Sequence, residues 1–230
     1  MKRMKKDKKF KIGIWTFDHR YPLFFSSLIL LFILPDVFEV LFGIHINFML
    51  PFSLVVLSSI FLVQASRRSY IISIFLVIFL IIFDLMAAEF VENRSMNMIL
   101  FSLLFFYFIW VTFFLFKDLY GSKTVTWQMI VGAFSGYFLI GVLGFFLLAF
   151  IEMEAPGSFS MQMHSLKELQ ALFYFSFVTM TTIGYGDILP VSNSARSAAI
   201  LLALFGQFYL AIVMAIMVGK FLSRPTTNEK

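Results

Sequence analysis

The chain has 230 residues, of which 60% are hydrophobic and 13% charged, and its formal net charge is +5 at pH 7. This composition lies outside the range of soluble globular domains and indicates a protein embedded in a lipid bilayer. The chain contains no cysteine, which excludes disulfides and thiolate metal sites. His19, His45 and His164 share no metal-ligand spacing, and no grouping of Ser, His and acid supports an enzyme. We expect no organic cofactor and no nucleic-acid partner.

The first twenty residues form a tail with several lysines and one arginine before position 12. Basic residues that flank apolar segments stay in the cytoplasm, so we expect this tail inside the cell. The tail could only set the topology, or it could also bind anionic lipid headgroups at about 1 kcal/mol per basic residue. A cleavable signal peptide is not expected, because Pro35 and Asp36 follow the first apolar segment without a small-residue cleavage site.

Six apolar segments follow the tail, and each is long enough to cross about 30 Å of hydrocarbon as a helix. They are residues 22–42, 48–64, 70–88, 98–116, 127–151 and 194–221. A shorter apolar segment, 166–180, is too short to span and predicts a re-entrant helix. The predicted fold class is an all-α membrane protein with six transmembrane helices and this re-entrant helix. Its parts are a four-helix domain at 21–117, a second domain at 127–222 and a short cytoplasmic tail at 223–230.

Positive charge marks two of the connections between these segments. Arg67 and Arg68 follow the second segment, and Lys117 and Lys123 follow the fourth. These are alternate connections, as six spans require, so both of them and both termini are expected in the cytoplasm. Acidic residues dominate the other connections. We therefore expect a multi-pass protein of the cell membrane in which Asp187 faces outward.

The segment Thr-Thr-Ile-Gly-Tyr-Gly-Asp, residues 181–187, lies between the re-entrant segment and the last apolar segment. Gly184 and Gly186 admit positive φ at little cost, so backbone conformations of alternating hand can align successive carbonyl groups on one side. Such a row of oxygens can replace the water around a cation. Thr182 adds a hydroxyl group at the inner end, while Ile183 and Tyr185 point away and brace the loop. One loop supplies only one side of a coordination cage, which predicts four copies around a symmetry axis.

Residues 182–186 are similar to the T-V-G-Y-G selectivity filter of potassium channels, with Ile183 in place of valine. The likeness extends over residues 127–222 as outer helix (127–151), pore helix (166–180), filter and inner helix (194–221). The first half resembles the six-span bacterial members of this pore-loop superfamily only in its number of spans. The resemblance implies a homotetramer that conducts potassium passively and holds the ions on the backbone carbonyls of residues 182–185.

The same resemblance implies roles for other residues. Tyr174 stands where many family members carry a tryptophan that bonds the filter aspartate, so we expect a hydrogen bond from the Tyr174 hydroxyl to Asp187. The resemblance implies that Thr181, like Tyr174 and Asp187, supports the filter. Asp187 could instead be an ordinary solvated loop carboxylate. Ser165 and Glu168 resemble a capping box that would start the pore helix, whose negative C-terminal end would favour a cation below the filter.

The inner helix carries Gly206 at the spacing where many channels place a hinge, although close helix packing explains a glycine equally well. Gln207 follows and could face the water-filled cavity or bond a neighbouring helix. Leu210, Met214 and Val218 follow at four-residue spacing and are expected to continue the cavity wall, where an apolar constriction could gate by dewetting.

The fourth apolar segment, residues 98–116, contains no arginine, which argues against voltage gating by a charged fourth helix. The sequence therefore predicts a potassium-selective channel whose gating stimulus is unassigned. Alternatives are an ion transporter subunit, a regulatory or poorly conducting subunit of a hetero-oligomeric channel, and a nonselective cation channel. Whether the first four helices pack on their own pore or on a neighbour's is left open.

Overall fold

The computed structural model describes residues 19–43, 49–63, 67–89, 94–121, 125–161 and 169–222. Throughout these residues the chain is helical apart from its connections, which confirms the all-α expectation. The helices are α2 (Arg20–Phe42), α3 (Met49–Ser59), α4 (Arg67–Glu89), α5 (Arg94–Gly121), α6 (Trp127–Glu154), α7 (Leu169–Met180) and α8 (Asn193–Leu222). Nearly all of the basic tail, the pair Ser165 and Glu168, His45, His164 and residues 223–230 lie outside the described residues.

Three helices among the described residues are long and apolar enough to cross a bilayer, namely those at Ser95–Gly121, Trp127–Glu154 and Asn193–Lys220. Shorter apolar helices cover Arg20–Pro35, Ser69–Leu80 and Leu169–Met180. Six full spans are therefore not confirmed. The predicted ranges 70–88, 127–151 and 194–221 agree with α4, α6 and α8 to within a few residues at each end.

The second predicted segment, 48–64, is wrong in length. α3 has 11 residues, which gives a rise of only about 16 Å, roughly half the thickness of the hydrocarbon layer. The chain leaves the helix at a tight turn, where the N–H of Leu62 donates to the carbonyl of Ser59 at 2.9 Å. The Ser59 hydroxyl also donates to the carbonyl of Val56 at 2.6 Å. Serine hydroxyls that compete for helix carbonyls in this way weaken the helix, which an apolar run alone does not reveal.

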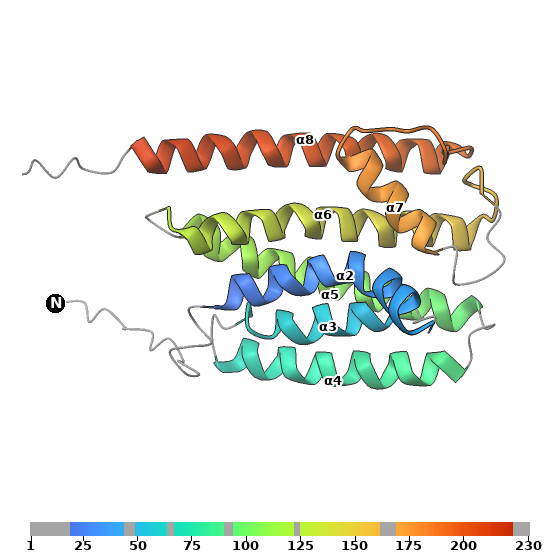
Figure 1. Ribbon diagram of the computed structural model, residues 1–230, viewed down its shortest axis with the longest axis horizontal. Helices are drawn as coiled ribbons and strands as arrows, with labels where there is room; N and C mark the ends of the chain where they lie inside the picture. The colour runs from blue at the N-terminus through green and yellow to red at the C-terminus, as the bar shows by residue number, and fades with distance from the viewer. Residues whose placement is uncertain are drawn as a thin grey trace, which may run out of the picture.

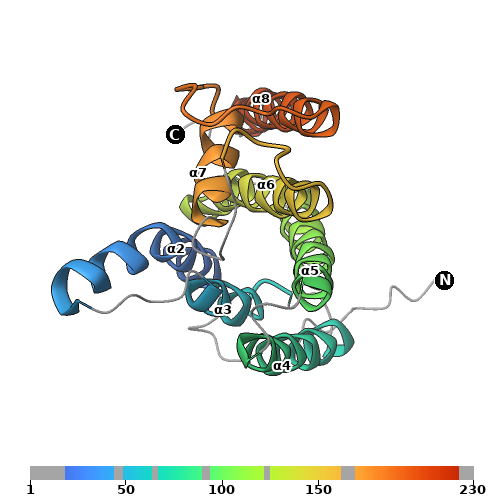
Figure 2. The same cartoon turned by 90° about the vertical axis from the view of Figure 1, so that its right-hand side faces the viewer.

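Most helices run side by side, and in chain order those from α2 to α6 alternate in direction, as do α6 and α8, while α7 crosses obliquely between α6 and α8 (Figure 1). α6 has a central position and packs against α2, α5, α7 and α8, whereas α4 lies farthest from α8 and packs mainly on α5 (Figure 2). The four-helix domain thus packs on the second domain of its own chain. Lys117 belongs to α5 rather than to a connection, because this helix continues to Gly121.

Phenylalanine rings join the two domains. Phe173 of α7 lies 5.4 Å from Phe145 of α6 and 6.0 Å from Phe52 of α3, measured between ring centroids. Phe32 of α2 lies 4.7 Å from Phe177 of α7. Such pairs contribute about 0.5–1.5 kcal/mol each beyond their buried area. The aromatic residues therefore fix α7 between α2, α3 and α6.

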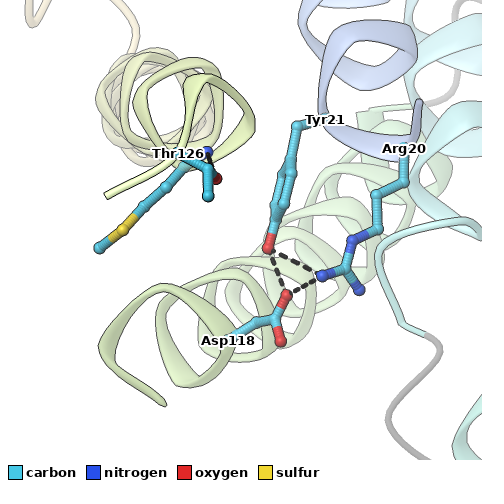
Figure 3. A network of polar contacts seen from close by, with 5 residues as sticks. Arg20, Tyr21, Asp118 and Thr126 are labelled. Carbon is cyan, nitrogen blue, oxygen red and sulfur yellow. Dashed lines mark hydrogen bonds and ion pairs between the residues drawn. The ribbon is translucent and has the colours of Figure 1, made fainter. Parts of the chain in front are cut away.

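A polar network joins α2 to α5 at the end of the bundle where α6 begins. The guanidinium of Arg20 and the hydroxyl of Tyr21 both donate to one carboxylate oxygen of Asp118, and Arg20 also forms an ion pair with that oxygen. Figure 3 shows the two side chains converging on Asp118 beside Thr126, which caps the start of α6. The Tyr21 ring also contacts Gly132 of α6. The start of α2 is therefore tied to both α5 and α6.

Candidate ion-binding site

The helix α7 approaches α6 very closely, and this approach positions the loop that follows it. The Ser176 hydroxyl, which is buried, donates to the carbonyl of Gly141 in α6 at 2.6 Å. A Cβ atom on Gly141 would come within 2.5 Å of the Phe177 ring. The glycine therefore permits the contact, and the hydroxyl bond fixes it.

The backbone of the loop after α7 alternates in hand. The φ angles of Thr182, Gly184 and Gly186 are 61°, 57° and 80°. Among the described residues, Thr182 is the one non-glycine residue with positive φ. A β-branched residue in this region is strained by roughly 1–2 kcal/mol. The sequence signals the glycine positions, but it does not signal the left-handed conformation of Thr182.

Hydrogen bonds to the end of α7 orient the first half of this loop. The N–H groups of Ile183 and Gly184 both donate to the carbonyl of Val178, at 3.0 and 3.3 Å. All peptide bonds in the described residues are trans, so the N–H and C=O of one peptide unit point in opposite directions. The carbonyl oxygens of Thr182 and Ile183 therefore point away from α7. This arrangement leaves consecutive oxygens on one side of the chain.

Thr181 closes the end of α7, because its hydroxyl donates to the carbonyl of Phe177 at 2.6 Å. Tyr174 lies in the middle of α7 and Asp187 lies just beyond the loop, and the two side chains come together in space. The Asp187 carboxylate raises the pKa of the Tyr174 phenol, first by a side-chain hydrogen bond and then, after partial desolvation, by its negative charge. Asp187 also accepts the N–H of Ile188 at 3.1 Å.

A second set of contacts holds the chain beyond Asp187 to the loop after α6. The N–H of Ser160 donates to the carbonyl of Leu189 at 2.9 Å, and the N–H of Val191 donates to the carbonyl of Ser158 at 2.7 Å. The buried carboxylate of Glu152 accepts the N–H groups of Gly157 and Phe159 at 2.8 and 3.2 Å. By sequence Glu152 is one of the acidic residues of a connection, but it lies in the last turn of α6, and no sequence signal points to these two hydrogen bonds.

The residues that the sequence assigns to the inner helix lie on α8. Gly206 is buried against Met180, the last residue of α7. Gln207, Leu210, Met214 and Val218 are all exposed within the single chain. Of the most apolar stretch of α8 only 17% is buried, compared with 56% for α6. In the loop, the side chains of Ile183 and Tyr185 are 54% and 70% exposed. One face of α8 and the loop thus lack a protein neighbour within the chain.

Comparison with known proteins adds independent information about this region. Residues 132–223 match a family model described as ion channel. Over 111 residues the chain is 33% identical to the inward rectifier potassium channel Kirbac3.1 of Paramagnetospirillum magnetotacticum, covering 46% of this chain and 34% of the relative. Over 54 residues it is 44% identical to the voltage-gated potassium channel Kch of Escherichia coli (strain K12), covering 24% of this chain and 13% of the relative.

A third relative is the potassium voltage-gated channel protein shk-1 of Caenorhabditis elegans, which is 35% identical over 72 residues, or 31% of this chain and 12% of the relative. The chain therefore spans about a third of the first relative's length and much less of the other two. No solved structure matches the chain. The matched family is one of ion channels rather than enzymes, and residues 132–223, which begin within α6 and end one residue after α8, are similar to it.

Proposed function

We propose that four copies of this chain form a potassium-selective channel of the cell membrane, with the loop at residues 182–186 as its filter. The single observation that carries the proposal is the alternating backbone of the loop, with positive φ at Thr182, Gly184 and Gly186. Successive carbonyls facing one side can replace the hydration shell of a cation. The potassium ions would bind to the backbone oxygens of Thr182, Ile183, Gly184 and Tyr185.

The four-copy assembly is supported by what the single chain leaves exposed. A row of oxygens on one side of a strand cannot surround an ion, whereas four such rows around an axis can. The exposed face of α8, with Gln207, Leu210 and Met214, would line the cavity below the filter. The same arrangement would give Ile183 and Tyr185 protein neighbours. Both termini would then lie in the cytoplasm, and Asp187 would face outward.

Voltage sensing by a row of arginines is not part of the proposal. The two voltage-gated relatives described above share with this chain stretches of 54 and 72 residues. Between residues 98 and 116 the chain carries no arginine, and gating charges must move through the membrane field to do work. We propose that the four-helix domain acts on the pore through packing contacts.

The experiment is cation flux into liposomes that contain the purified protein. We expect potassium uptake that barium blocks, with little sodium uptake. Gly184→Ala should abolish selective uptake because alanine strains a φ of +57°. Gly157→Ala is the matched control, since its φ is +85° and open space surrounds it as well. It carries a backbone penalty at least as large outside the filter and should preserve uptake.

Three outcomes contradict the proposal. Equal sodium and potassium uptake indicates a nonselective cation channel, and silence that ends when another pore-forming subunit is added indicates a regulatory subunit. Equal loss of uptake in both glycine variants indicates that backbone strain alone, and not the filter, explains the result.

A further inference from the structure

The last turn of α8 is bonded to the last turn of α5. The ammonium of Lys220 donates to the carbonyl oxygens of Leu119 and Tyr120, at 3.0 and 3.4 Å. α5 ends at Gly121, so the carbonyls of its last turn have no partner within the helix. They also carry the negative end of the helix dipole. A lysine ammonium satisfies both the unpaired oxygens and the partial charge.

A second polar contact lies three turns earlier on α8. The Tyr209 hydroxyl donates to the carbonyl of Ala133 in α6 at 2.6 Å. Its ring stacks on Phe116 of α5 with a centroid distance of 5.7 Å. Tyr209 and Lys220 are eleven residues apart, which places them on the same side of a helix with 3.6 residues per turn. The two contacts therefore bracket one surface of α8.

Apolar side chains fill the surface between these contacts. Val213, Ile216 and Met217 line a small cavity of about 20 Å³ together with Leu119 and Met129. The exposed Leu210, Met214 and Val218 lie elsewhere around α8. Because α8 is one continuous helix, any rotation or tilt that moves its exposed face must also move the face held at Tyr209 and Lys220.

The bonded end of α5 is itself anchored to α2. Asp118 precedes Leu119 and binds Arg20 and Tyr21 (Figure 3). Consecutive residues of α5 thus contact the first described helix and the last one. Through this turn the four-helix domain is in direct contact with the end of α8.

We propose that the bonds of Lys220 to Leu119 and Tyr120, and of Tyr209 to Ala133, form a conformational switch, the α8 latch, that sets the balance between open and closed pores. This inference rests on the proposed channel function. With the latch formed, α8 keeps the position seen in this structure. Its release lets the end of α8 move away from α5 and changes the width of the inner pore.

Single-channel recording in planar bilayers tests the latch. Lys220→Met keeps the apolar stem and removes the ammonium with both of its hydrogen bonds. It should change the open-to-closed ratio about threefold to tenfold, the effect expected mainly from the shorter bond, to Leu119. Tyr209→Phe should change the ratio in the same direction. Lys220→Arg keeps a cation and should restore most of the wild-type ratio. Lys117→Met removes an exposed charge from the same end of α5 and should have no effect.

A covalent bridge between α5 and α8 should have the opposite effect to Lys220→Met. Because the chain has no native cysteine, the pair Tyr120→Cys and Lys220→Cys can be joined by a short bis-maleimide without side reactions. Cross-linking should shift the open-to-closed ratio opposite to Lys220→Met. Each single-cysteine variant treated with the same reagent is the control and should not show this shift.

The outcomes separate the two proposals. A wild-type protein without potassium flux overturns the channel function and the latch with it. A conducting protein whose open-to-closed ratio ignores Lys220→Met, Tyr209→Phe and the cross-link overturns the latch alone. A poor cross-linking yield in the conducting protein contradicts the contact between α5 and α8 on which the latch depends.

Discussion

Gly206 of α8 lies directly against the carbonyl oxygen of Met180, the last residue of α7. A Cβ atom at Gly206 would come within 2.6 Å of that oxygen and of the Met180 Cγ, closer than non-bonded atoms can pack. α8 continues through this point as one helix from Asn193 to Leu222 (Figure 1). In this conformation the glycine serves close packing of α8 on α7, and α8 is not interrupted there.

Gly206→Ala is therefore expected to destabilise the protein by about 1–3 kcal/mol, as for overpacking in a filled core. The clash involves a backbone oxygen next to Thr181, so the variant should also weaken potassium selectivity. Gly219→Ala is the matched control on the same helix, because a Cβ atom added there would have no neighbouring atom within 4 Å. It should be neutral or stabilising by up to about 1 kcal/mol.

Thermal denaturation of the two variants in detergent measures this difference. Equal melting temperatures would contradict the packing role. A normal melting temperature for Gly206→Ala together with an altered open probability would instead favour a hinge at this position.

We expect the contact between Tyr174 and Asp187 to stabilise the outer end of the loop. Tyr174→Phe removes the hydroxyl and keeps the ring, and we expect potassium flux to decay severalfold faster during sustained conduction. Tyr120→Phe is the control, because it removes an exposed hydroxyl from α5 and keeps the main-chain carbonyl that Lys220 contacts. Flux that decays at the wild-type rate in Tyr174→Phe would show that the contact has no influence on the filter.

The pH dependence of this contact follows from the raised pKa of the Tyr174 phenol. A phenol ordinarily loses its proton near pH 10, and a raised pKa keeps the hydroxyl as a donor up to still higher pH. The contribution of this donor is therefore fully present below pH 10 and is lost only as the pH rises through the raised value. We expect the same flux decay at pH 7 and pH 9, and a Tyr174-dependent acceleration in that interval would be inconsistent with this sign.

We expect the hydrogen bonds of Glu152 to stabilise the loop after α6. Its carboxylate accepts two backbone N–H groups, and Glu152→Gln replaces one acceptor oxygen with a donor. We expect a loss of about 1–3 kcal/mol, the cost of leaving a buried donor unsatisfied. Limited proteolysis of the loop at residues 155–161 should be faster in this variant than in Glu154→Gln, whose side chain is exposed. Equal cleavage rates would contradict the role of Glu152.

We expect Asp118→Ala and Asp118→Asn to lower the stability of the protein by different amounts. The Arg20 and Asp118 side chains are 14% and 37% exposed, so the ion pair alone contributes little, about 0–1 kcal/mol. Asp118→Ala also leaves the hydroxyl of Tyr21, a buried residue, without its acceptor, which should raise the cost to about 1–3 kcal/mol. Asp118→Asn keeps an acceptor oxygen and should cost less. The melting temperature in detergent measures both, and equal losses would mean that the hydroxyl bond is unimportant.

Particular residues show what the sequence could predict. Long apolar runs located α4, α6 and α8 because membrane helices need continuous apolar surface. Gly184 and Gly186 located the alternating backbone because few other residues adopt positive φ. The sequence did not reveal the short α3, since Ser58 and Ser59 look unremarkable in an apolar run.

Long-range contacts were also invisible in the sequence. By sequence alone Lys220 is an ordinary cation at the end of a membrane helix. Its bond to Leu119 forms because the last turns of α5 and α8 lie next to each other in the fold. Glu152 reads as a loop charge, and its two N–H partners arise only from the fold of the loop after α6. Such contacts join residues whose separation carries no periodic signal.

The most direct test of the central claim is the cation density in an experimental structure of the membrane-reconstituted assembly, determined once in potassium and once in sodium. We predict four copies around one axis, with density peaks in potassium between rings of carbonyl oxygens from residues 182–185, and a changed or emptied row of peaks in sodium. A monomer or dimer, or a loop distant from any symmetry axis with no cation beside these oxygens, would contradict the account.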